Sequence, residues 1–133
     1  MSDVDRELQE VIAVAMEDNR LLAVMLFGSR ARGEVKATSD VDLCLLLDPK
    51  HYDADVAASV KLDYLKNTPD CFDIQIYQSL PIYIRRRVLA EGRVLCCRDD
   101  DALYDLALRT IREFEDFRPR YQYYLDEVAR AGS

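Results

Sequence analysis

The chain has 133 residues and a formal net charge of −7, and its length is typical of one domain. With a sequence pI near 4.7, it lacks the basic surface through which a non-specific nucleic-acid binder releases phosphate counterions, so we expect no nucleic-acid partner. A nucleotide-binding enzyme stays compatible with this charge, because bound metal ions can supply positive charge.

The sequence predicts neither a membrane segment nor a targeting sequence. The longest uninterrupted apolar run, 21–27, is far shorter than the ~20 residues of a membrane helix. The acidic N-terminus lacks the pattern of a signal peptide, so we expect a cytoplasmic protein with no membrane partner. The four cysteines lack Cys-x-x-Cys spacing and His51 is the single histidine, which favours reduced core thiols over a zinc site.

The first half of the chain is predicted to form a helix, two strands and a second helix. Apolar residues at helical spacing predict an amphipathic helix over 3–18. Residues 22–27 and 41–47 are predicted to be buried strands, and the polar segment 30–39 between them cannot be a long regular element. A further helix is expected over 53–66.

The second half begins with a strand over 72–77, where apolar and polar residues alternate as in a half-buried strand. A helix over 81–91 follows, with a proline in its first turn and Gly92 at its end. Residues 93–97 are expected to form a short fourth strand.

A long helical pattern covers 99–129, and Pro119 is expected to kink or break it. The sequence therefore predicts an α/β (α+β) fold in which helices flank a small mixed β-sheet. We expect residues 1–98 to form the core, and 99–133 to form a helical extension packed on the same single domain.

A glycine–serine pair follows the first predicted strand. Gly28 permits a sharp turn and the close approach of a ligand. Ser29 is a good N-cap, and free backbone amides at a helix start bind anions such as phosphate. By itself the pair is a common turn.

Three aspartates can gather at one edge of the sheet. Because alternate strand residues point to one face, Asp40 and Asp42 project together while Val41 and Leu43 enter the core. Asp73 points away from the core in its own strand, and it joins them if the two strands are neighbours. A divalent cation such as Mg²⁺ would relieve the repulsion between these carboxylates.

The spacing of these residues resembles a known family. The segments FGSRARG (27–33) and TSDVDL (38–43) resemble the DNA-polymerase-β-like nucleotidyltransferase superfamily, and within it the minimal nucleotidyltransferase (MNT) proteins of the MntA-like antitoxin type. The strong motif spans about residues 24–47, and a looser match extends through Asp73 to residue 95.

The resemblance implies a nucleotidyltransferase fold, metal-dependent chemistry and a set of site residues. Gly28 and Ser29 would hold the triphosphate of ATP or another NTP, with Arg30 as an additional phosphate contact. Asp40 and Asp42 would bind two Mg²⁺ ions, and Asp73 would complete one metal site near the acceptor hydroxyl. All three aspartates would then be catalytic.

The resemblance also implies a partner, because such proteins form the antitoxin half of toxin–antitoxin pairs with a helical HEPN-domain ribonuclease. AMP would pass from ATP to a tyrosine hydroxyl of that toxin. Two other readings stay open: a non-catalytic antitoxin that masks its partner by contact, and an antibiotic-type nucleotidyltransferase that needs a helical partner subunit.

The C-terminal segment carries more aromatic residues than one helix needs to cover a small sheet. They either pack in the core or form an exposed face that docks a partner or a second copy, as in a homodimer. The run Arg85, Arg86 and Arg87 is expected to be a solvated helix face rather than a phosphate site.

Overall fold

The computed structural model describes residues 3–28 and 41–131. Four α-helices, one 3₁₀ turn and four strands follow one another along this part of the chain. In chain order they are α1 (Asp3–Met16), β1 (Leu21–Phe27), β2 (Val41–Leu47), α2 (Ala54–Lys66), β3 (Phe72–Ile76), η1 (Tyr77–Ser79), α3 (Ile82–Glu91), β4 (Arg93–Cys97) and α4 (Asp100–Ala131). All of the predicted helices and strands in these ranges are confirmed, with ends that differ by one or two residues.

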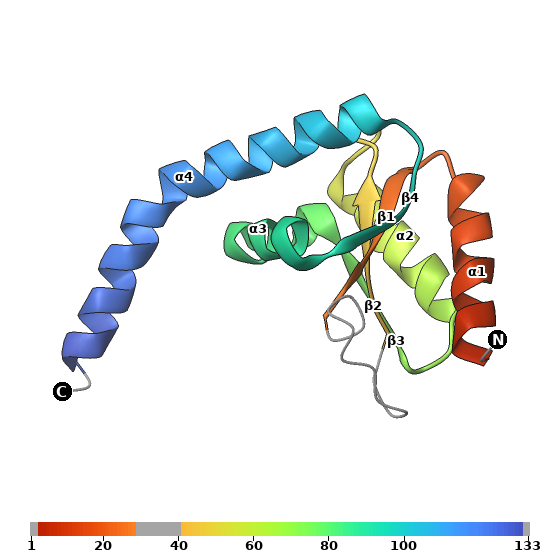
Figure 1. Ribbon diagram of the computed structural model, residues 1–133, viewed down its shortest axis with the longest axis horizontal. Helices are drawn as coiled ribbons and strands as arrows, with labels where there is room; N and C mark the ends of the chain where they lie inside the picture. The colour runs from red at the N-terminus through yellow and green to blue at the C-terminus, as the bar shows by residue number, and fades with distance from the viewer. Residues whose placement is uncertain (1–2, 29–40, 132–133) are drawn as a thin grey trace.

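The strands form one mixed sheet in the order β3-β2-β1-β4 (Figure 1). β1 pairs antiparallel with both β2 and β4, whereas β2 and β3 run parallel. The parallel pair is possible because α2 crosses over between β2 and β3. The predicted small mixed sheet flanked by helices is therefore confirmed.

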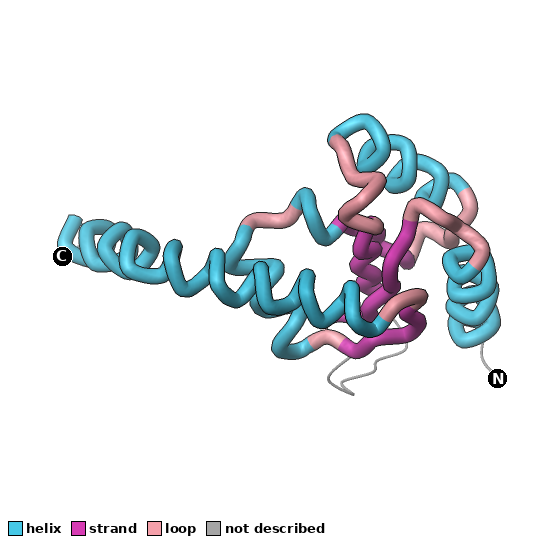
Figure 2. Tube along the Cα trace, turned by 90° about the horizontal axis from the view of Figure 1, so that it is seen from above, coloured by secondary structure: helices cyan, strands magenta, loops and turns pink. Residues whose placement is uncertain are grey.

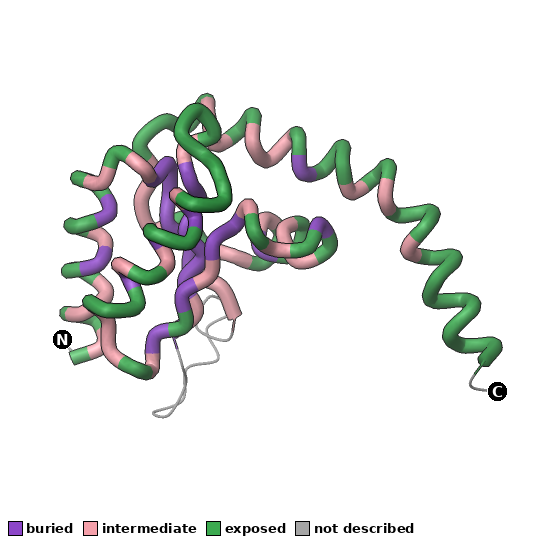
Figure 3. Tube along the Cα trace, turned by 180° about the vertical axis from the view of Figure 1, so that it is seen from behind, coloured by how far each residue is buried: buried purple, intermediate pink, exposed green. Residues whose placement is uncertain are grey.

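Two apolar layers lie on opposite faces of this sheet. On one face, α1 and α2 pack Val11, Ala15 and Val60 against alternate strand residues such as Leu43 and Ile74. On the other face, α3 and α4 cover the remaining strand residues, such as Met25 and Leu46, together with Tyr77 of η1. Figure 3 shows the buried residues concentrated in the sheet between these layers. Both central strands are therefore buried on two faces, as their continuous apolar runs predict.

The helix ends follow the local sequence. Asp53 is the N-cap of α2, and its carboxylate accepts a hydrogen bond of 2.8 Å from the backbone N–H of Val56. Gly92 follows α3, and its backbone N–H donates to the carbonyl of Val88. The strand predicted over 72–77 ends one residue early, because Tyr77 begins the 3₁₀ turn. Gln78 of this turn exchanges two hydrogen bonds with the backbone of Leu47.

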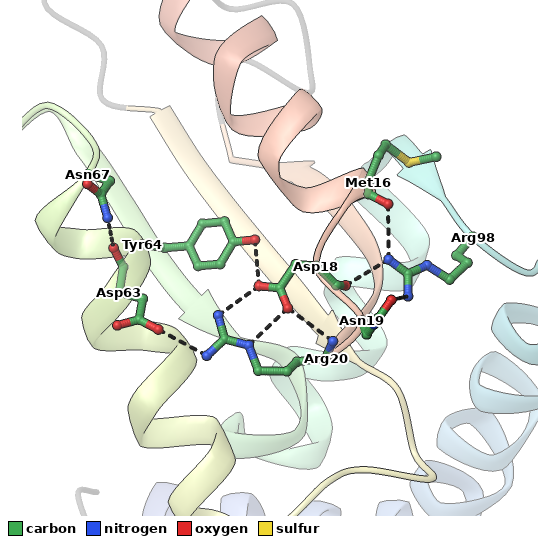
Figure 4. Close-up of polar contacts among 8 residues, drawn as sticks. All are labelled: Met16, Asp18, Asn19, Arg20, Asp63, Tyr64, Asn67 and Arg98. Atoms are coloured by element: carbon green, nitrogen blue, oxygen red, sulfur yellow. Dashed lines mark hydrogen bonds and ion pairs between the residues drawn. The ribbon is translucent and has the colours of Figure 1, made fainter.

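A polar network holds the turn between α1 and β1 against α2 (Figure 4). The Asp18 carboxylate accepts hydrogen bonds from the Arg20 guanidinium and from the hydroxyl of Tyr64. Arg20 also forms an ion pair of 3.0 Å with Asp63 of α2. Chiefly through the Arg20 hydrogen bond, the pKa of Asp18 lies below its usual value. The network therefore joins the α1–β1 turn to α2, within the helical layer that covers one face of the sheet.

The last helix has two different halves. Its N-terminal half packs on α3 and the sheet, where the buried Thr110 hydroxyl bonds to the Tyr77 hydroxyl. Its C-terminal half extends beyond the rest of the structure in two perpendicular views (Figures 1 and 2). Of the kink or break expected at Pro119, the break does not occur, because α4 runs unbroken from Asp100 to Ala131. It does change direction partway along (Figure 1), as expected where a proline removes one intrahelical hydrogen bond.

Candidate active site

The carboxylates of Asp42 and Asp73 lie on neighbouring strands at the same height. The two residues are register partners in the parallel β2–β3 pair, so their side chains point to the same face of the sheet, the face that α3 covers. On the other side of Asp42, Phe27 is its register partner in β1. Phe27, Asp42 and Asp73 therefore form a row across three strands, and neighbouring strands are about 4.8 Å apart.

Gly28 touches this row directly. Its backbone φ is +80°, a conformation that side chains disfavour. A Cβ atom added at this position would lie 3.3 Å from Cγ of Asp42 and nearer still to one of its carboxylate oxygens. Both the turn after β1 and the space beside Asp42 therefore require glycine.

A pocket of about 340 Å³ opens beside the two carboxylates. Its polar edge is formed by Asp42, Asp73 and Gln75. Apolar side chains from β1, β2, the β3–α3 connection and α3 form the rest: Phe27, Leu43, Cys44, Leu80, Ile84 and Val88. Such a pocket fits a group with a flat apolar body and a polar end that reaches the carboxylates.

Cys44 lines the pocket but is not suited to hold a metal. Its side chain is buried, and burial raises the pKa of its thiol to about 12. Sulfur is also a soft ligand, whereas Mg²⁺ prefers carboxylate oxygens, so Cys44 does not fit that cation. All four cysteines are free thiols, but of the predicted core positions only that of Cys44 is confirmed, since the other three are partly exposed.

The carboxylate pair fits a hard divalent cation, because carboxylate oxygens are the ligands that Mg²⁺ prefers. Three of the predicted site residues, Gly28, Asp42 and Asp73, come together as expected. The other three, Ser29, Arg30 and Asp40, lie outside the described residues. Within the described ranges, no three acidic, histidine or cysteine side chains gather as a metal site.

The arginine run of α3 connects helices. Arg85 forms an ion pair with Glu113 of α4 and donates a hydrogen bond to the carbonyl of Leu80. The guanidinium of Arg86 lies 5.3 Å from the ring centre of Phe114. These contacts hold α4 onto α3; the predicted solvated face is wrong for the partly buried Arg85, whereas Arg86 is exposed as predicted.

Sequence analysis did not single out the apolar wall of the pocket or Gln75. The wall comes from α3, whose position over the sheet a sequence pattern does not give. Gln75 had a usable signal, because it is two residues from Asp73 in a strand and so faces the same side.

The chain matches a known family and a named relative. The family model described as polymerase beta, nucleotidyltransferase matches residues 9–101. A Methanocaldococcus jannaschii protein named as a protein adenylyltransferase is 27% identical over 77 residues, which cover 58% of this chain and 57% of the relative. The chain thus matches little more than half the length of that relative.

Two solved structures share the fold. A chain of a toxin–antitoxin crystal structure with AMP-PNP matches with a TM-score of 0.70 and 18% identity, over 93% of this chain and 97% of that chain. A chain of the complex between a tri-AMPylated Shewanella oneidensis HEPN toxin and its MNT antitoxin matches with a TM-score of 0.66 and 19% identity. That match covers 94% of this chain and 98% of the other. No helix in the described part of the chain is long and apolar enough to cross a membrane.

Proposed function

The chain belongs to the polymerase beta nucleotidyltransferase family, and from that membership we propose that it transfers AMP from ATP to a tyrosine hydroxyl of a HEPN toxin, as the antitoxin of the pair. The observation that carries this proposal is the row Phe27, Asp42 and Asp73 at the mouth of the apolar pocket. It combines a carboxylate pair for metal-dependent chemistry with a place for an aromatic acceptor.

The nucleotide would lie against the turn after β1. Gly28 leaves room for its phosphates close to the backbone and to Asp42. By family resemblance, the amide and hydroxyl of Ser29 and the guanidinium of Arg30 hold the triphosphate. The AMP-PNP bound in a toxin–antitoxin complex of similar fold supports ATP as the donor.

Asp42 and Asp73, with Asp40 by family resemblance, would hold two Mg²⁺ ions. When bound, the ions neutralise charge on the attacking and leaving oxygens of an in-line displacement. The chain's own contribution is positional, because the rigid strand register keeps the two carboxylates side by side.

The reaction forms a bond between the acceptor oxygen and the α-phosphorus. The bond from that phosphorus to the oxygen bridging to the β-phosphate breaks, and pyrophosphate leaves with the electron pair. Asp73 lies at the edge of the pocket, where it can accept a hydrogen bond from the acceptor hydroxyl and orient it. As the new bond forms, the hydroxyl proton passes to the Asp73 carboxylate and from there to solvent.

The apolar wall supports an aromatic acceptor. Phe27, Ile84 and Val88 offer surface to a ring, while Asp42 and Asp73 lie where its hydroxyl would end. A serine or a sugar hydroxyl would leave this wall uncovered. The AMPylated toxin in a complex of similar fold supports a protein acceptor.

The C-terminal half of α4 supports a helical partner. The seam begins at the buried Thr110 in the N-terminal half, and aromatic and apolar residues then continue it at alternating steps of four and three, as in a coiled coil: Phe114, Phe117, Tyr121, Tyr124 and Val128. Tyr83 of α3 stacks on Tyr121 at 5.4 Å between ring centres. Beyond Tyr121, Tyr124 and Val128 are 62% and 51% exposed. The seam therefore continues past the part of α4 that α3 covers (Figure 3). We assign this stretch to the toxin.

Intact mass measurement tests the proposal. The protein and a candidate HEPN partner are incubated with ATP and Mg²⁺, and the partner should gain the mass of one or more AMP groups. Peptide mapping should place them on tyrosine. Tight complex formation with no added mass would instead support masking by contact, and transfer to an aminoglycoside would support the antibiotic-modifying alternative.

A further inference from the structure

We propose that Gln75 is a positioning residue that orients the carboxylate of Asp73 for metal binding. This inference rests on the proposed function, since it concerns how the same site holds its cation. It adds a residue that neither the family resemblance nor the comparisons assign.

Asp73 and Gln75 are alternate residues of β3, so both point to the face that α3 covers. The side-chain amide nitrogen of Gln75 lies 3.3 Å from Oδ1 of Asp73, and because a carboxylate only accepts, the amide donates this hydrogen bond. Both side chains line the pocket.

This hydrogen bond matters because, in the described part of the chain, few other contacts restrain the orientation of the Asp73 carboxylate. Its side chain is exposed at an edge strand, where a carboxylate can rotate among several orientations. The negative charge of its register partner Asp42 favours turning away from the site in the absence of a cation. Donation to Oδ1 opposes both effects, since it selects the orientations in which that oxygen faces Gln75.

The neighbouring strand β2 offers Gln75 no charged partner at the same height. The register partner of Gln75 in β2 is Cys44, a buried side chain that is neither a carboxylate nor a cationic group. The amide therefore has no charged group at its own height of β2 to draw it from Asp73. Loss of a donor that hydrogen-bonds to a metal ligand commonly weakens metal binding by about 10- to 100-fold.

Gln75→Met tests the inference, because methionine has a similar length and no donor. Mn²⁺ is the probe, and its binding to the protein with a non-hydrolysable ATP analogue is followed by electron paramagnetic resonance, without any acceptor. We expect about 10-fold weaker Mn²⁺ binding, the low end of the range because Asp73 is exposed. In the transfer assay the Mg²⁺ concentration for half-maximal rate should rise similarly, while kcat at saturating Mg²⁺ stays near that of the wild type.

Gln78→Met is the matched control. Within the described residues, the side chain of Gln78 bonds only to the backbone of Leu47 and does not line the pocket. Its loss should therefore lower the melting temperature and leave Mn²⁺ affinity unchanged. Equal Mn²⁺ affinity in the wild type, Gln75→Met and a second variant, Gln75→Ala, would overturn the inference. Failure of the wild type to bind Mn²⁺ with the nucleotide analogue would instead overturn the proposed function.

Discussion

Gly28 and Asp42 are in contact across the β1–β2 pair, at a distance that leaves no space for a side chain at position 28. Gly28, the first of the phosphate-binding residues in the proposed function, is thus fitted directly against one of the carboxylates. A change at either residue displaces the other.

Gly28→Ala should therefore abolish nucleotide transfer. The new methyl group collides with the Asp42 carboxylate, and the positive φ adds a strain of about 1–3 kcal/mol. Transfer rate and urea denaturation measure the two effects. Gly92→Ala is the control, because the added methyl group also crowds its neighbours, Met25 among them, but Gly92 lies outside the pocket. This variant should lose stability, while its folded fraction keeps the wild-type transfer rate. Normal transfer by Gly28→Ala would contradict the assignment.

Asp42→Asn should reduce transfer at least 1,000-fold and leave the fold intact. The amide removes a charged oxygen from the proposed cation site, and it also removes the repulsion with Asp73. Labelled ATP and circular dichroism measure the two properties. Asp70→Asn, in the exposed turn before β3, should transfer like the wild type. Equal label incorporation by both variants would refute the role of Asp42.

Thr110→Val should lower the free energy of unfolding by about 1–3 kcal/mol, because it leaves the fully buried Tyr77 hydroxyl without its partner. The double variant Tyr77→Phe, Thr110→Val removes both hydroxyls and should recover part of this loss. Urea denaturation of the single and double variants gives the coupling directly. Additive losses would show that the two hydroxyls do not depend on each other.

Asp18→Asn should destabilise the protein at neutral pH but not at low pH. The folded-state pKa of Asp18 is lowered, chiefly by the Arg20 hydrogen bond, so its contribution is present above the unfolded pKa of about 3.9 and is lost as pH falls through the folded-state value. We expect a neutral-pH loss of about 2 kcal/mol, typical of hydrogen bonds to a charged group.

Asp63→Asn is the matched control for that experiment. It removes one ion pair whose carboxylate is half-exposed, which typically contributes under about 1 kcal/mol. Thermal unfolding between pH 7 and pH 3 should show the wild-type and Asp18→Asn curves converging. A gap that stays constant with pH would mean that Asp18 acts through packing alone.

Tyr124→Glu should weaken the toxin complex at least 10-fold without changing nucleotide binding. The substitution places a charge in the uncovered seam of α4, beyond the contacts that hold this helix to α3. Tyr123→Glu is matched in chemistry, but helical geometry puts it well away from the seam, so it should bind like the wild type. Analytical ultracentrifugation measures both the toxin complex and any self-association. Dimers of the wild type alone that Tyr124→Glu dissolves would assign the seam to a second copy.

Much of this architecture is predictable from the sequence. Continuous apolar runs identify both central strands, and alternation identifies β3 and places Asp73 away from the core. The pairing of Asp42 with Asp73 required one further assumption, that β2 and β3 are neighbours, which the structure confirms.

Other features depend on tertiary packing and were not predictable. Pro119 disfavours a helix locally, yet α4 continues through it, since a proline costs one hydrogen bond while the flanking turns keep theirs. Phe117 and Tyr121 stack on either side of this position. Arg85 and Arg86 looked like solvated charges because their partners, Glu113 and Phe114, lie on a different helix.

One half of α4 packs on α3 and the sheet, whereas the other half projects from them. This difference affects how the sequence of the helix can change during evolution. Among the described residues, those that would carry the chemistry lie on β2 and β3 or directly after β1, and none lies on the projecting half of α4. Substitutions there can accumulate without disturbing the sheet or the pocket. A lineage of such proteins could thus exchange one partner for another by drift in a single exposed helix, while the strands that hold the reacting groups stay the same.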